Sequence, residues 1–421
     1  MSLAVSGLPC GIPLSVRTRV RFQPPTRVPL HVMRTNAKAG ADTGSADPGG
    51  EGDSKTIIIV GAGIIGSSIA YHLATNHNQK CTLIDKSGPG AAASGKAGGF
   101  LALDWCDGSA LGPLARASFP MHQELAETLQ IDSYRRLTCR AVAVDEKEVL
   151  NPNKPSNKKL EHVEWADVGT VGSRPMGDEN TIAQVHPMRL VEAYLKGAKD
   201  SVGTDVVIGD AQTLVFDSDN NKVTGVTVDG FYLQADIVIA AMGPWTNKLV
   251  PCELLNREIY GQKYHAVLLR PKHVLSQAVF FQGLGDPEFY PRPDGDVYVC
   301  AYPDPAEVMT EEPGHVEVRP DAVDRLINVS RKLSSEMSDS LSAPIKKNAD
   351  GSVGQSCHLP ITDNGVPVMG PVRGISNLHV ATGHGCWGIL NSPASGAAMA
   401  ELVANGEVTL IPKFLEMYAP K

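Results

Sequence analysis

Residues 56–66 read Thr56-Ile57-Ile58-Ile59-Val60-Gly61-Ala62-Gly63-Ile64-Ile65-Gly66, and this stretch decides the fold of the chain. It is a short apolar strand followed by three glycines at GxGxxG spacing, and helix-like residues come next. Gly61 allows a tight turn, Gly63 lets the backbone approach a pyrophosphate, and Gly66 lets the helix pack on the strand. Phosphates would bind free N–H groups at the start of that helix, where the helix dipole favours negative charge.

A second apolar strand strengthens this interpretation. Residues 81–84 are Cys-Thr-Leu-Ile, and they lead directly into Asp85. An acidic residue at the end of the second strand is placed to bind the 2′-hydroxyl of an adenine ribose. Because strand, glycines, helix and acid follow in order, the opening predicts a dinucleotide-binding domain rather than a glycine turn in an ordinary α/β core.

Composition limits the remaining possibilities. The chain has 421 residues and a net charge of −8, which does not suggest a nucleic-acid or anionic-membrane partner. It contains no run of 18 apolar residues, so no transmembrane helix is expected. The eight cysteines never approach C-x₂-C spacing, which argues against a zinc site or a disulfide framework.

The N-terminus differs from the rest of the chain. The first 41 residues contain no Asp or Glu and carry six cations: Arg17, Arg19, Arg21, Arg27, Arg34 and Lys38. This composition predicts an organelle transit peptide, and a disordered basic terminus is the alternative. Residues 39–53 lack large apolar side chains, which is typical of a linker, so we expect folded structure to begin near Lys55.

The middle of the chain alternates between strand and helix patterns. Residues 87–100 are almost all small, which favours a loop whose amides lie against a ligand; a flexible surface loop is the alternative. The pattern predicts helices at 113–130, 188–199 and 317–340, and an exposed loop at 146–159. Four strands of a β-meander are predicted at 205–208, 213–216, 223–228 and 231–233. Strands near 264–270, 277–281 and 296–301 predict a second, mostly antiparallel sheet.

The C-terminal part returns to the pattern of the opening. A buried strand at 235–241 and another at 378–381 are followed, after a glycine-rich turn, by a small-residue helix at about 389–404. A dinucleotide fold that opens at the N-terminus and closes with C-terminal sequence implies two discontinuous domains. This arrangement is more typical of flavoproteins than of nicotinamide dehydrogenases.

Four segments resemble the D-amino-acid-oxidase-type family of FAD-dependent oxidoreductases, which includes glycine and sarcosine oxidases. They are the GxGxxG opening, the loop 93–99, the segment Ala240-Ala241-Met242-Gly243-Pro244-Trp245, and the blocks 359–371 and 381–388. The combination of residues 94–100 with Asp104-Trp105-Cys106 is also similar to a little-characterised branch found in fungi and plants.

The resemblance implies an α/β fold with a Rossmann-type, glutathione-reductase-like FAD-binding domain and a discontinuous, mainly antiparallel substrate domain. The expected division is 1–54 for transit peptide and linker, 55–105, 186–255 and 351–421 for the FAD-binding domain, and 106–185 and 256–350 for the substrate domain. The implied cofactor is FAD. The implied cofactor-binding residues are Gly61, Gly63, Ile64, Ile65, Gly66, Asp85, Lys86, Ser94, Gly98, Gly99, Phe100, Gly383, His384, Gly385, Cys386, Trp387, Gly388 and Ile389.

The helix start at residues 385–389 is expected to stabilise the negative charge of a reduced flavin. Within it, Cys386 is expected to be a small buried residue. Trp387 packs either on the flavin or in the core. His384 either donates to flavin or substrate or holds the glycine turn. Cys357 lies where some sarcosine-oxidase relatives attach flavin covalently, or it is an ordinary buried cysteine.

Amino-acid oxidases of this family bind the substrate carboxylate through an arginine near residue 359. Here Leu359-Pro360 stands where an Arg-Pro step is expected, which puts a simple α-amino acid substrate in doubt. Arg292 is a possible replacement, and a surface arginine in a hairpin turn is the alternative. Tyr264 and His265 lie on one strand, so only one of them can face a cavity. His384, His265 and Arg292 are therefore the candidates for direct roles in the reaction.

The predicted function is oxidation of a C–N bond in an amine or amino-acid-like small molecule, with hydride passing to flavin N5 and water hydrolysing the imine. The alternative is a flavin-retaining interaction or trafficking protein with little turnover. A nicotinamide-dependent dehydrogenase would leave the C-terminal glycine turn without a ligand. The predicted localisation is the chloroplast, with the mitochondrion as the alternative, because the first 41 residues are free of acids and contain arginine and serine. The C-terminus Ala419-Pro420-Lys421 lacks the Ser-Lys-Leu peroxisomal address.

Overall fold

The computed structural model describes residues 55–151, 159–305, 307–340, 342–349 and 351–421. Lys55–Lys421 forms one compact unit. The predicted transit peptide and linker at 1–54 lie outside the described residues. The division of residues 55–421 into FAD-binding and substrate domains stays a prediction, although two large sheets are present.

The first sheet has six strands in the order β18-β19-β12-β1-β2-β8. Its strands are β1 (Ile57–Val60), β2 (Cys81–Asp85), β8 (Asp205–Ile208), β12 (Ile237–Ala240), β18 (Val368–Pro371) and β19 (Leu378–Thr382). All neighbours are parallel except β18 and β19. The residues of β1 are all buried, with Ile57 and Ile59 in the core on one face and Ile58 and Val60 in the core on the other. A parallel sheet covered on both faces explains why this strand is apolar throughout.

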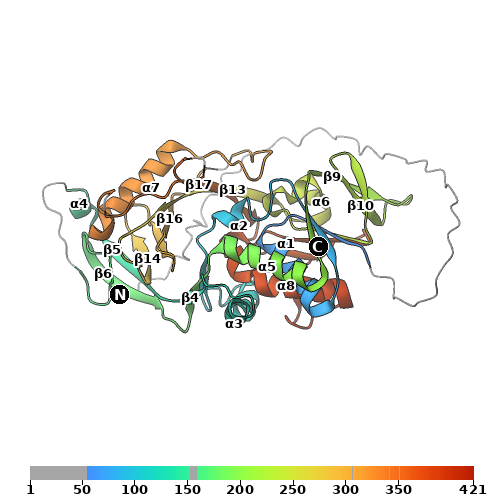
Figure 1. The fold of residues 1–421 in the computed structure, drawn as a ribbon, viewed down its shortest axis with the longest axis horizontal. Helices are drawn as coiled ribbons and strands as arrows, with labels where there is room; N and C mark the ends of the chain where they lie inside the picture. Colours follow the sequence, from blue (N-terminus) through green and yellow to red (C-terminus); the bar gives the residue numbers. More distant parts are fainter. Residues whose placement is uncertain (1–54, 152–158, 306, 341, 350) are drawn as a thin grey trace. The chain divides into compact units, whose positions relative to one another are not determined.

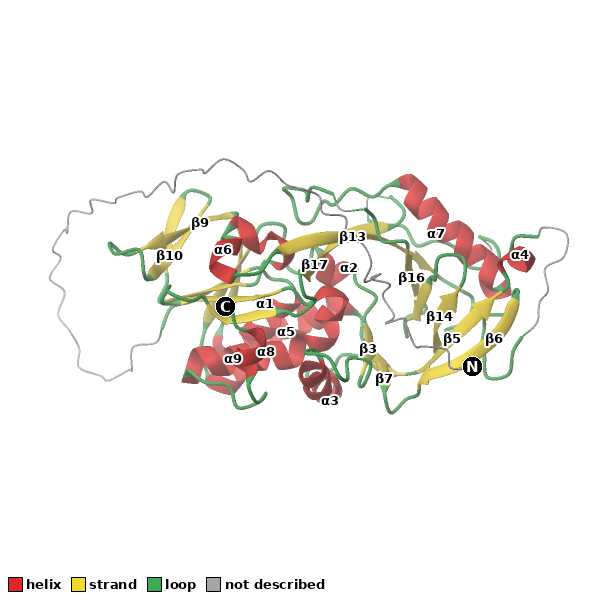
Figure 2. Ribbon diagram, turned by 180° about the vertical axis from the view of Figure 1, so that it is seen from behind, coloured by secondary structure: helices red, strands yellow, loops and turns green. Residues whose placement is uncertain are grey.

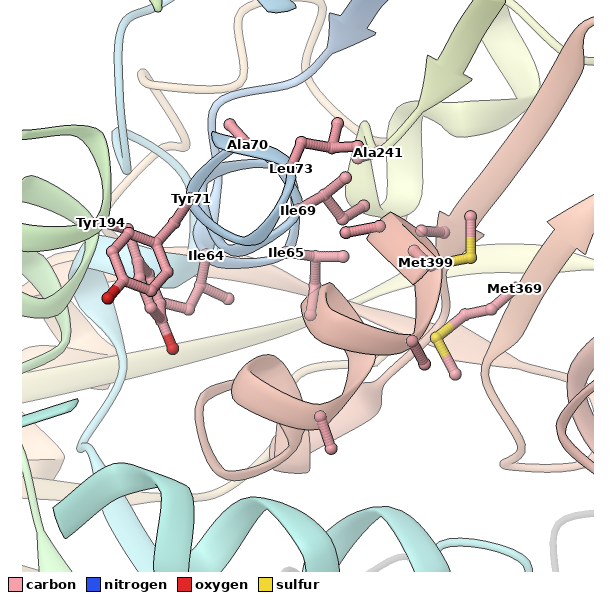
Figure 3. Close-up of a cluster of buried hydrophobic side chains, with 14 of the residues drawn as sticks. Ile64, Ile65, Ile69, Ala70, Tyr71, Leu73, Tyr194, Ala241, Met369 and Met399 are labelled. Carbon is pink, nitrogen blue, oxygen red and sulfur yellow. The ribbon is translucent and has the colours of Figure 1, made fainter. Parts of the chain in front are cut away.

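Helices cover one face of this sheet (Figure 1). They are α1 (Ile64–His77), α3 (Gly112–Thr128), α5 (Pro187–Val202), α8 (Gly388–Asn405) and the short α9 (Phe414–Tyr418). Helix α1 contacts both α5 and α8. Figure 3 shows Ile65 and Ile69 of α1 on the side of α8, whereas Tyr71 lies beside Tyr194 of α5. A Cβ on Gly396 of α8 would lie 2.1 Å from Ser68 Oγ, so a small residue is needed where the two helices cross.

The second sheet has seven strands in the order β17-β13-β16-β15-β14-β5-β6. They are β5 (Thr138–Val144), β6 (Thr170–Gly177), β13 (Ile259–Leu269), β14 (Gln277–Gln282), β15 (Glu288–Pro291), β16 (Val297–Ala301) and β17 (Gln355–Thr362). Only β14 and β5 pair in parallel, so the predicted antiparallel character is confirmed. Helix α7 (Pro320–Leu333) lies along this sheet (Figure 2) and packs on one of its faces.

The smaller elements complete the chain. A third sheet joins β3 (Phe100–Ala102), β7 (Ile182–Gln184) and β4 (Arg135–Arg136). Short helices are α2 (Ala93–Lys96), α4 (Glu146–Val149), α6 (Cys252–Leu255), η1 (Gly243–Lys248), η2 (Ser335–Met337) and η3 (Gly385–Trp387). No helix in the described part of the chain has the length and apolar character needed to cross a bilayer.

The predicted four-stranded meander is wrong in one strand. Strands β9 (Ala211–Phe216), β10 (Val223–Val228) and β11 (Phe231–Gln234) form an antiparallel sheet, but β8 pairs in parallel with β2 at the edge of the first sheet. Local alternation identifies a strand without identifying its partner, which explains the error.

Three local predictions also need correction. The exposed loop expected from residue 146 begins as α4, because the Asp145 carboxylate accepts the N–H groups of Lys147 and Glu148. Residues 152–158 of that loop lie outside the described residues. The small-residue loop, which is the segment of residues 87–100, was predicted to be a loop throughout but contains one helical turn, α2. Helix α7 ends at Leu333, since Ser334 is extended and its side chain caps η2.

Candidate functional site

A cavity of about 400 Å³ lies at the carboxyl ends of β1, β2, β12 and β19. This edge of a doubly wound sheet is where such folds bind ligands. Its wall includes Gly61, Gly63, Ile64, Ile65, Asp85, Lys86, Ser94, Gly383, His384, Gly385, Cys386, Gly388 and Ile389 from the predicted cofactor residues. The structure therefore brings the N-terminal glycine loop and the C-terminal glycine turn to one site.

The three glycines of the opening have different surroundings. Gly61 has φ +105°, and its Cβ would lie 2.3 Å from the Ala241 carbonyl oxygen. A Cβ on Gly66 would lie 1.9 Å from the Gly61 carbonyl oxygen, and Gly66 is outside the cavity wall. Gly63 faces the cavity, and its Cβ would meet only Ser94 Oγ, at 3.1 Å. Gly61 and Gly66 are thus required by packing, whereas Gly63 keeps space open for a ligand.

The start of α1 forms a polar end of the cavity. Ser94 Oγ accepts the Ile64 N–H at 2.9 Å, and Ile64 and Ile65 both line the cavity. The first N–H groups of a helix have no partner within the helix, and the dipole makes this end favourable for an anion. The arrangement is suited to a phosphate group.

The Asp85 carboxylate is held by the backbone. Its Oδ2 accepts the Ala62 N–H at 2.8 Å, and its Oδ1 accepts the N–H groups of Ser87 and Gly88 at 2.9 and 2.8 Å. Lys86, also at the cavity wall, pairs with Asp210 and Glu312. Asp85 is consequently a fixed acceptor beside the glycine loop, as a ribose hydroxyl requires.

The C-terminal turn forms the other wall. Gly383 has φ +81°, and η3 leads directly into α8 at Gly388. Cys386 is exposed and lines the cavity, so the expectation of a buried residue is wrong. The 3₁₀ turn directs Trp387 away from the cavity wall, and its ring meets Trp105 edge-on at 6.3 Å. In the structure Trp387 therefore packs against protein.

His384 is buried within this turn and is 3% exposed. Its Nε2 lies 3.0 Å from Ser395 Oγ, and burial lowers its pKa to about 3. The imidazole is therefore neutral at physiological pH. Among the described residues, Nδ1 has no hydrogen-bond partner. His384 thus both anchors the turn to α8 and keeps one ring nitrogen unpaired.

Gly98, Gly99 and Phe100 do not line the cavity. A Cβ on Gly98 would lie 2.3 Å from the Tyr290 ring, and one on Gly99 would lie 2.0 Å from the Val185 carbonyl oxygen. The Phe100 ring stacks on Tyr290 with a centroid distance of 5.2 Å. These residues join the small-residue loop to the second sheet, so close packing accounts for both glycines.

Neither His265 nor Arg292 lines the cavity. His265 Nε2 accepts the Arg319 N–H at 3.0 Å, and its Nδ1 lies 3.2 Å from Asp304 Oδ2. His265 is buried and its neighbour Tyr264 is half-buried, as alternation predicts. These contacts make His265 an internal anchor.

Arg292 is 3% exposed, so the surface-hairpin alternative is wrong. It donates to the Ala97 carbonyl oxygen at 3.0 Å, and its guanidinium carbon lies 5.6 Å from the centre of the Tyr298 ring. The side chain is directed inward because this hairpin packs against the small-residue loop.

Leu359 and Pro360 both line the cavity, whereas Cys357 does not. Burial raises the pKa of the Cys357 thiol to about 11, which leaves it protonated at neutral pH. Lys86 and Lys248 are the cations that the described cavity wall contains, and Lys248 pairs with Glu311. Leu359 and Pro360 thus add apolar side chains and no positive charge to the wall.

Three parts of the wall were missed as site residues in the sequence. They are 209–212, after β8, then 241–245 together with Lys248, after β12, and finally Glu311 with Pro313, which precede α7. The second could have been found, because a strand that pairs beside β1 must end at the same edge of the sheet. The first depended on the position of β8, which local alternation misassigned.

FAD fits the residues of this site. The start of α1 and the space beside Gly63 suit a pyrophosphate, Asp85 suits a ribose, and Leu359, Pro360 and Ile389 supply apolar surface for a ring system. The start of α8 adds N–H groups at the same wall.

Comparison with known proteins agrees with this site. The family model described as "FAD dependent oxidoreductase" (DAO) matches residues 56–402. The chain is 31% identical to the protein C1F5.03c of Schizosaccharomyces pombe, over 85% of this chain and 96% of that protein. It is 25% identical to glycine oxidase of Geobacillus kaustophilus, over 83% and 93%. The crystal structure of glycine oxidase from Bacillus cereus has the same fold, with a TM-score of 0.68, 22% identity, and coverage of 84% and 96%. The chain therefore belongs to the DAO family of FAD-dependent oxidoreductases and is an enzyme that uses FAD.

Proposed function

We propose that this enzyme oxidises a C–N bond of an amine or amino-acid-like substrate. The observation that carries the proposal is the shared cavity wall. It contains Gly61, Gly63, Ile64 and Ile65 from the N-terminal glycine loop, and residues 383–386, 388 and 389 from the turn that starts α8. A glycine oxidase is similar to this chain over 93% of its own length. FAD supplies the acceptor for a hydride from the carbon next to nitrogen.

The chain's own residues would bind the cofactor and stabilise charge on it. The start of α1 and Gly63 would hold the pyrophosphate, and Asp85 would hold the ribose. The start of α8 would stabilise negative charge at the wall formed by residues 385–389. Neutral His384 can offer a hydrogen bond through its unpaired ring nitrogen without adding charge.

The test is anaerobic reduction of the flavin in the full-length protein. We expect at least one compound in a panel of amines, N-methyl amino acids and D-amino acids to bleach the flavin absorbance. Substrate reduction supports the proposal, because the family's hydride chemistry needs no further protein nucleophile. Reduction by dithionite alone, with no response to any amine, would support the flavin-retaining interaction protein instead.

We further propose that the enzyme is imported into the chloroplast, with the mitochondrion as the second candidate. The acid-free, arginine-containing first 41 residues support targeting. Residues 1–54 fused to a fluorescent reporter in plant cells should direct it to chloroplasts. Mitochondrial signal would select the second organelle, and a diffuse cytosolic signal would argue decisively against targeting.

A further inference from the structure

One face of the second sheet carries an unusual carboxylic acid. Glu288 begins β15, and Phe280 of β14 and Cys300 of β16 lie directly opposite it. Tyr290 follows on the same face, whereas Phe289 between them packs with the core on the α7 side. Alternation along β15 therefore turns Glu288 away from α7 and toward the face that meets the small-residue loop.

Aromatic rings surround this part of the face. We call Phe100, Trp105, Phe280, Tyr290 and Trp387 the aromatic cluster. Successive ring centres are 5.0 Å apart for Phe100–Trp105, 5.2 Å for Trp105–Phe280, 5.6 Å for Phe280–Tyr290 and 6.3 Å for Trp105–Trp387. The cluster joins the second sheet to residue 387 of the C-terminal turn, whose neighbours His384 and Gly388 line the cofactor cavity. The cluster therefore begins one residue along the chain from the cavity wall.

Glu288 has few polar partners. Tyr290 donates its hydroxyl hydrogen to Glu288 Oε2, and the Cys300 thiol lies 3.7 Å from the same oxygen. Among the described residues, no lysine, arginine or histidine is within ion-pair distance of this carboxyl group. Burial raises the pKa of Glu288 to about 7. Although part of the Glu288 residue reaches solvent, its carboxyl group is surrounded by protein and has no cation beside it, so ionising this group is costly and does not favour the folded state.

The titratable neighbours do not supply the missing positive charge. They are Tyr290 and Cys300, which hydrogen-bond to the carboxyl group, Tyr298 and Cys139, whose pKa values are raised by burial, and Asp286, whose charge raises the pKa of Glu288 further. Each is neutral or anionic. Arg174 lowers the pKa of Cys139 and Arg292 lowers the pKa of Tyr298, but neither arginine contributes to the pKa of Glu288. A bound cation would therefore be the first positive charge beside Glu288.

The surface remains reachable. Glu288, Phe100, Trp105, Trp387 and Cys300 are each only half-buried, although they lie where the second sheet meets the loop of residues 97–105. Aromatic faces attract cations, and the attraction grows when water is excluded. The half-buried rings of Phe100, Trp105 and Trp387, backed by the buried rings of Phe280 and Tyr290, together with the Glu288 carboxylate match an ammonium group.

We propose that Glu288 and the aromatic cluster bind the substrate as a cationic amine, the carboxylate serving as counter-ion to its ammonium group. The inference rests on the proposed function and names its substrate class. It also explains the apolar wall at Leu359, because the enzyme would recognise the positively charged nitrogen of its substrate and would need no cation to bind a substrate carboxylate. An alkyl or aromatic ammonium compound without an acidic group is the chemistry that this patch fits.

The test measures binding without turnover. Benzyltrimethylammonium has no lone pair on nitrogen, so it cannot be oxidised to an imine, and it should quench tryptophan fluorescence of the full-length holoprotein. With a pKa of about 7, the ionised fraction of Glu288 rises about tenfold between pH 6 and pH 8. Affinity for the cation should rise by about the same factor. Benzoate, of similar size and opposite charge, should not bind competitively.

Variants assign the effect to one residue. Glu288→Gln should weaken cation binding about tenfold or more at pH 8 and remove the pH dependence. Asp286→Asn removes an exposed carboxylate of the same hairpin and keeps the acceptor for the Gly283 N–H. It also removes a charge that raises the pKa of Glu288, but at pH 8 that carboxyl group is already mostly ionised, so the variant should bind the cation within about twofold of wild type at this pH. Circular dichroism and flavin content establish that each variant is folded and loaded.

The outcomes separate this inference from the proposed function. Suppose that cation binding depends on Glu288 but that no amine in the panel reduces the flavin. This result would support the inference about Glu288 and overturn the proposed function. Amine-driven flavin reduction with unchanged cation binding in Glu288→Gln would retain the function and overturn the inference. Tight benzoate binding with no response to the cation would also overturn it.

Discussion

Gly63→Val should abolish FAD binding and leave the fold intact, giving a colourless protein. The structure explains why this position is separable from the other two glycines. Gly63 caps α1 with φ −70°, which valine tolerates, and a Cβ there would meet only the Ser94 hydroxyl oxygen. The added methyl groups would instead occupy the space where the backbone approaches a pyrophosphate. The measurement is flavin absorbance per protein after purification, with circular dichroism to establish folding.

Two other glycine variants serve as controls for this experiment. Gly172 lies on β6 with no atom within 4 Å of its would-be Cβ, so Gly172→Val should purify with normal flavin content. Gly66→Val should fail to fold, because its side chain would overlap the Gly61 carbonyl oxygen. A yellow Gly63→Val protein with full flavin content would contradict the assignment of this loop to the pyrophosphate.

Glycine, sarcosine and D-alanine should be poor substrates, no better than the corresponding amines that lack the carboxylate. The physical reason is the apolar wall at Leu359 and Pro360, together with the internal engagement of Arg292 by the Ala97 carbonyl oxygen. A hydrogen bond to a charged group contributes about 1.5–3 kcal/mol, which is roughly tenfold to hundredfold in affinity. Without a cationic partner, a substrate carboxylate gains none of this.

Matched compounds make the comparison direct. Sarcosine and dimethylamine differ by the carboxylate, as do D-alanine and ethylamine. Stopped-flow reduction under anaerobic conditions should give apparent affinities for each amino acid that do not exceed those of its amine. Rapid bleaching by millimolar glycine or D-alanine would show that a cation does reach the substrate, with Arg292 the first residue to substitute.

Local rules account for the parts of the structure that could be predicted. The opening strand, turn and helix depend on residues within about 20 positions, and β1, β2 and α1 appear where the pattern indicates. The predicted C-terminal helix matches α8 because glycines bound it at Gly388 and Gly406. The ends of these elements and the turns beside them also hold several of the predicted cofactor residues that line the cavity.

The features that could not be predicted depend on contacts between residues far apart in the sequence. Strand β8 has the alternation of its neighbours, and only its partner β2 separates it from them. The sequence around Glu288 does not indicate its surroundings either. They depend on the strand register, which places Phe280 and Cys300 opposite Glu288. Arg292 appeared in a turn-like sequence, and its burial follows from the loop that covers it. No pattern within a short window contains this information.

The interleaving of the first sheet affects how the enzyme is made. Ile239 of β12 pairs with Ile59 on one side and with His379 on the other, so three distant parts of the chain form one row of the sheet. Until the ribosome has synthesised β19, the N–H and C=O groups along that edge of β12 have no partner strand and are open to pairing with other strands. The wall at residues 381–389 is also absent until then. The nascent enzyme must therefore remain soluble through nearly all of its translation before it can acquire its cofactor.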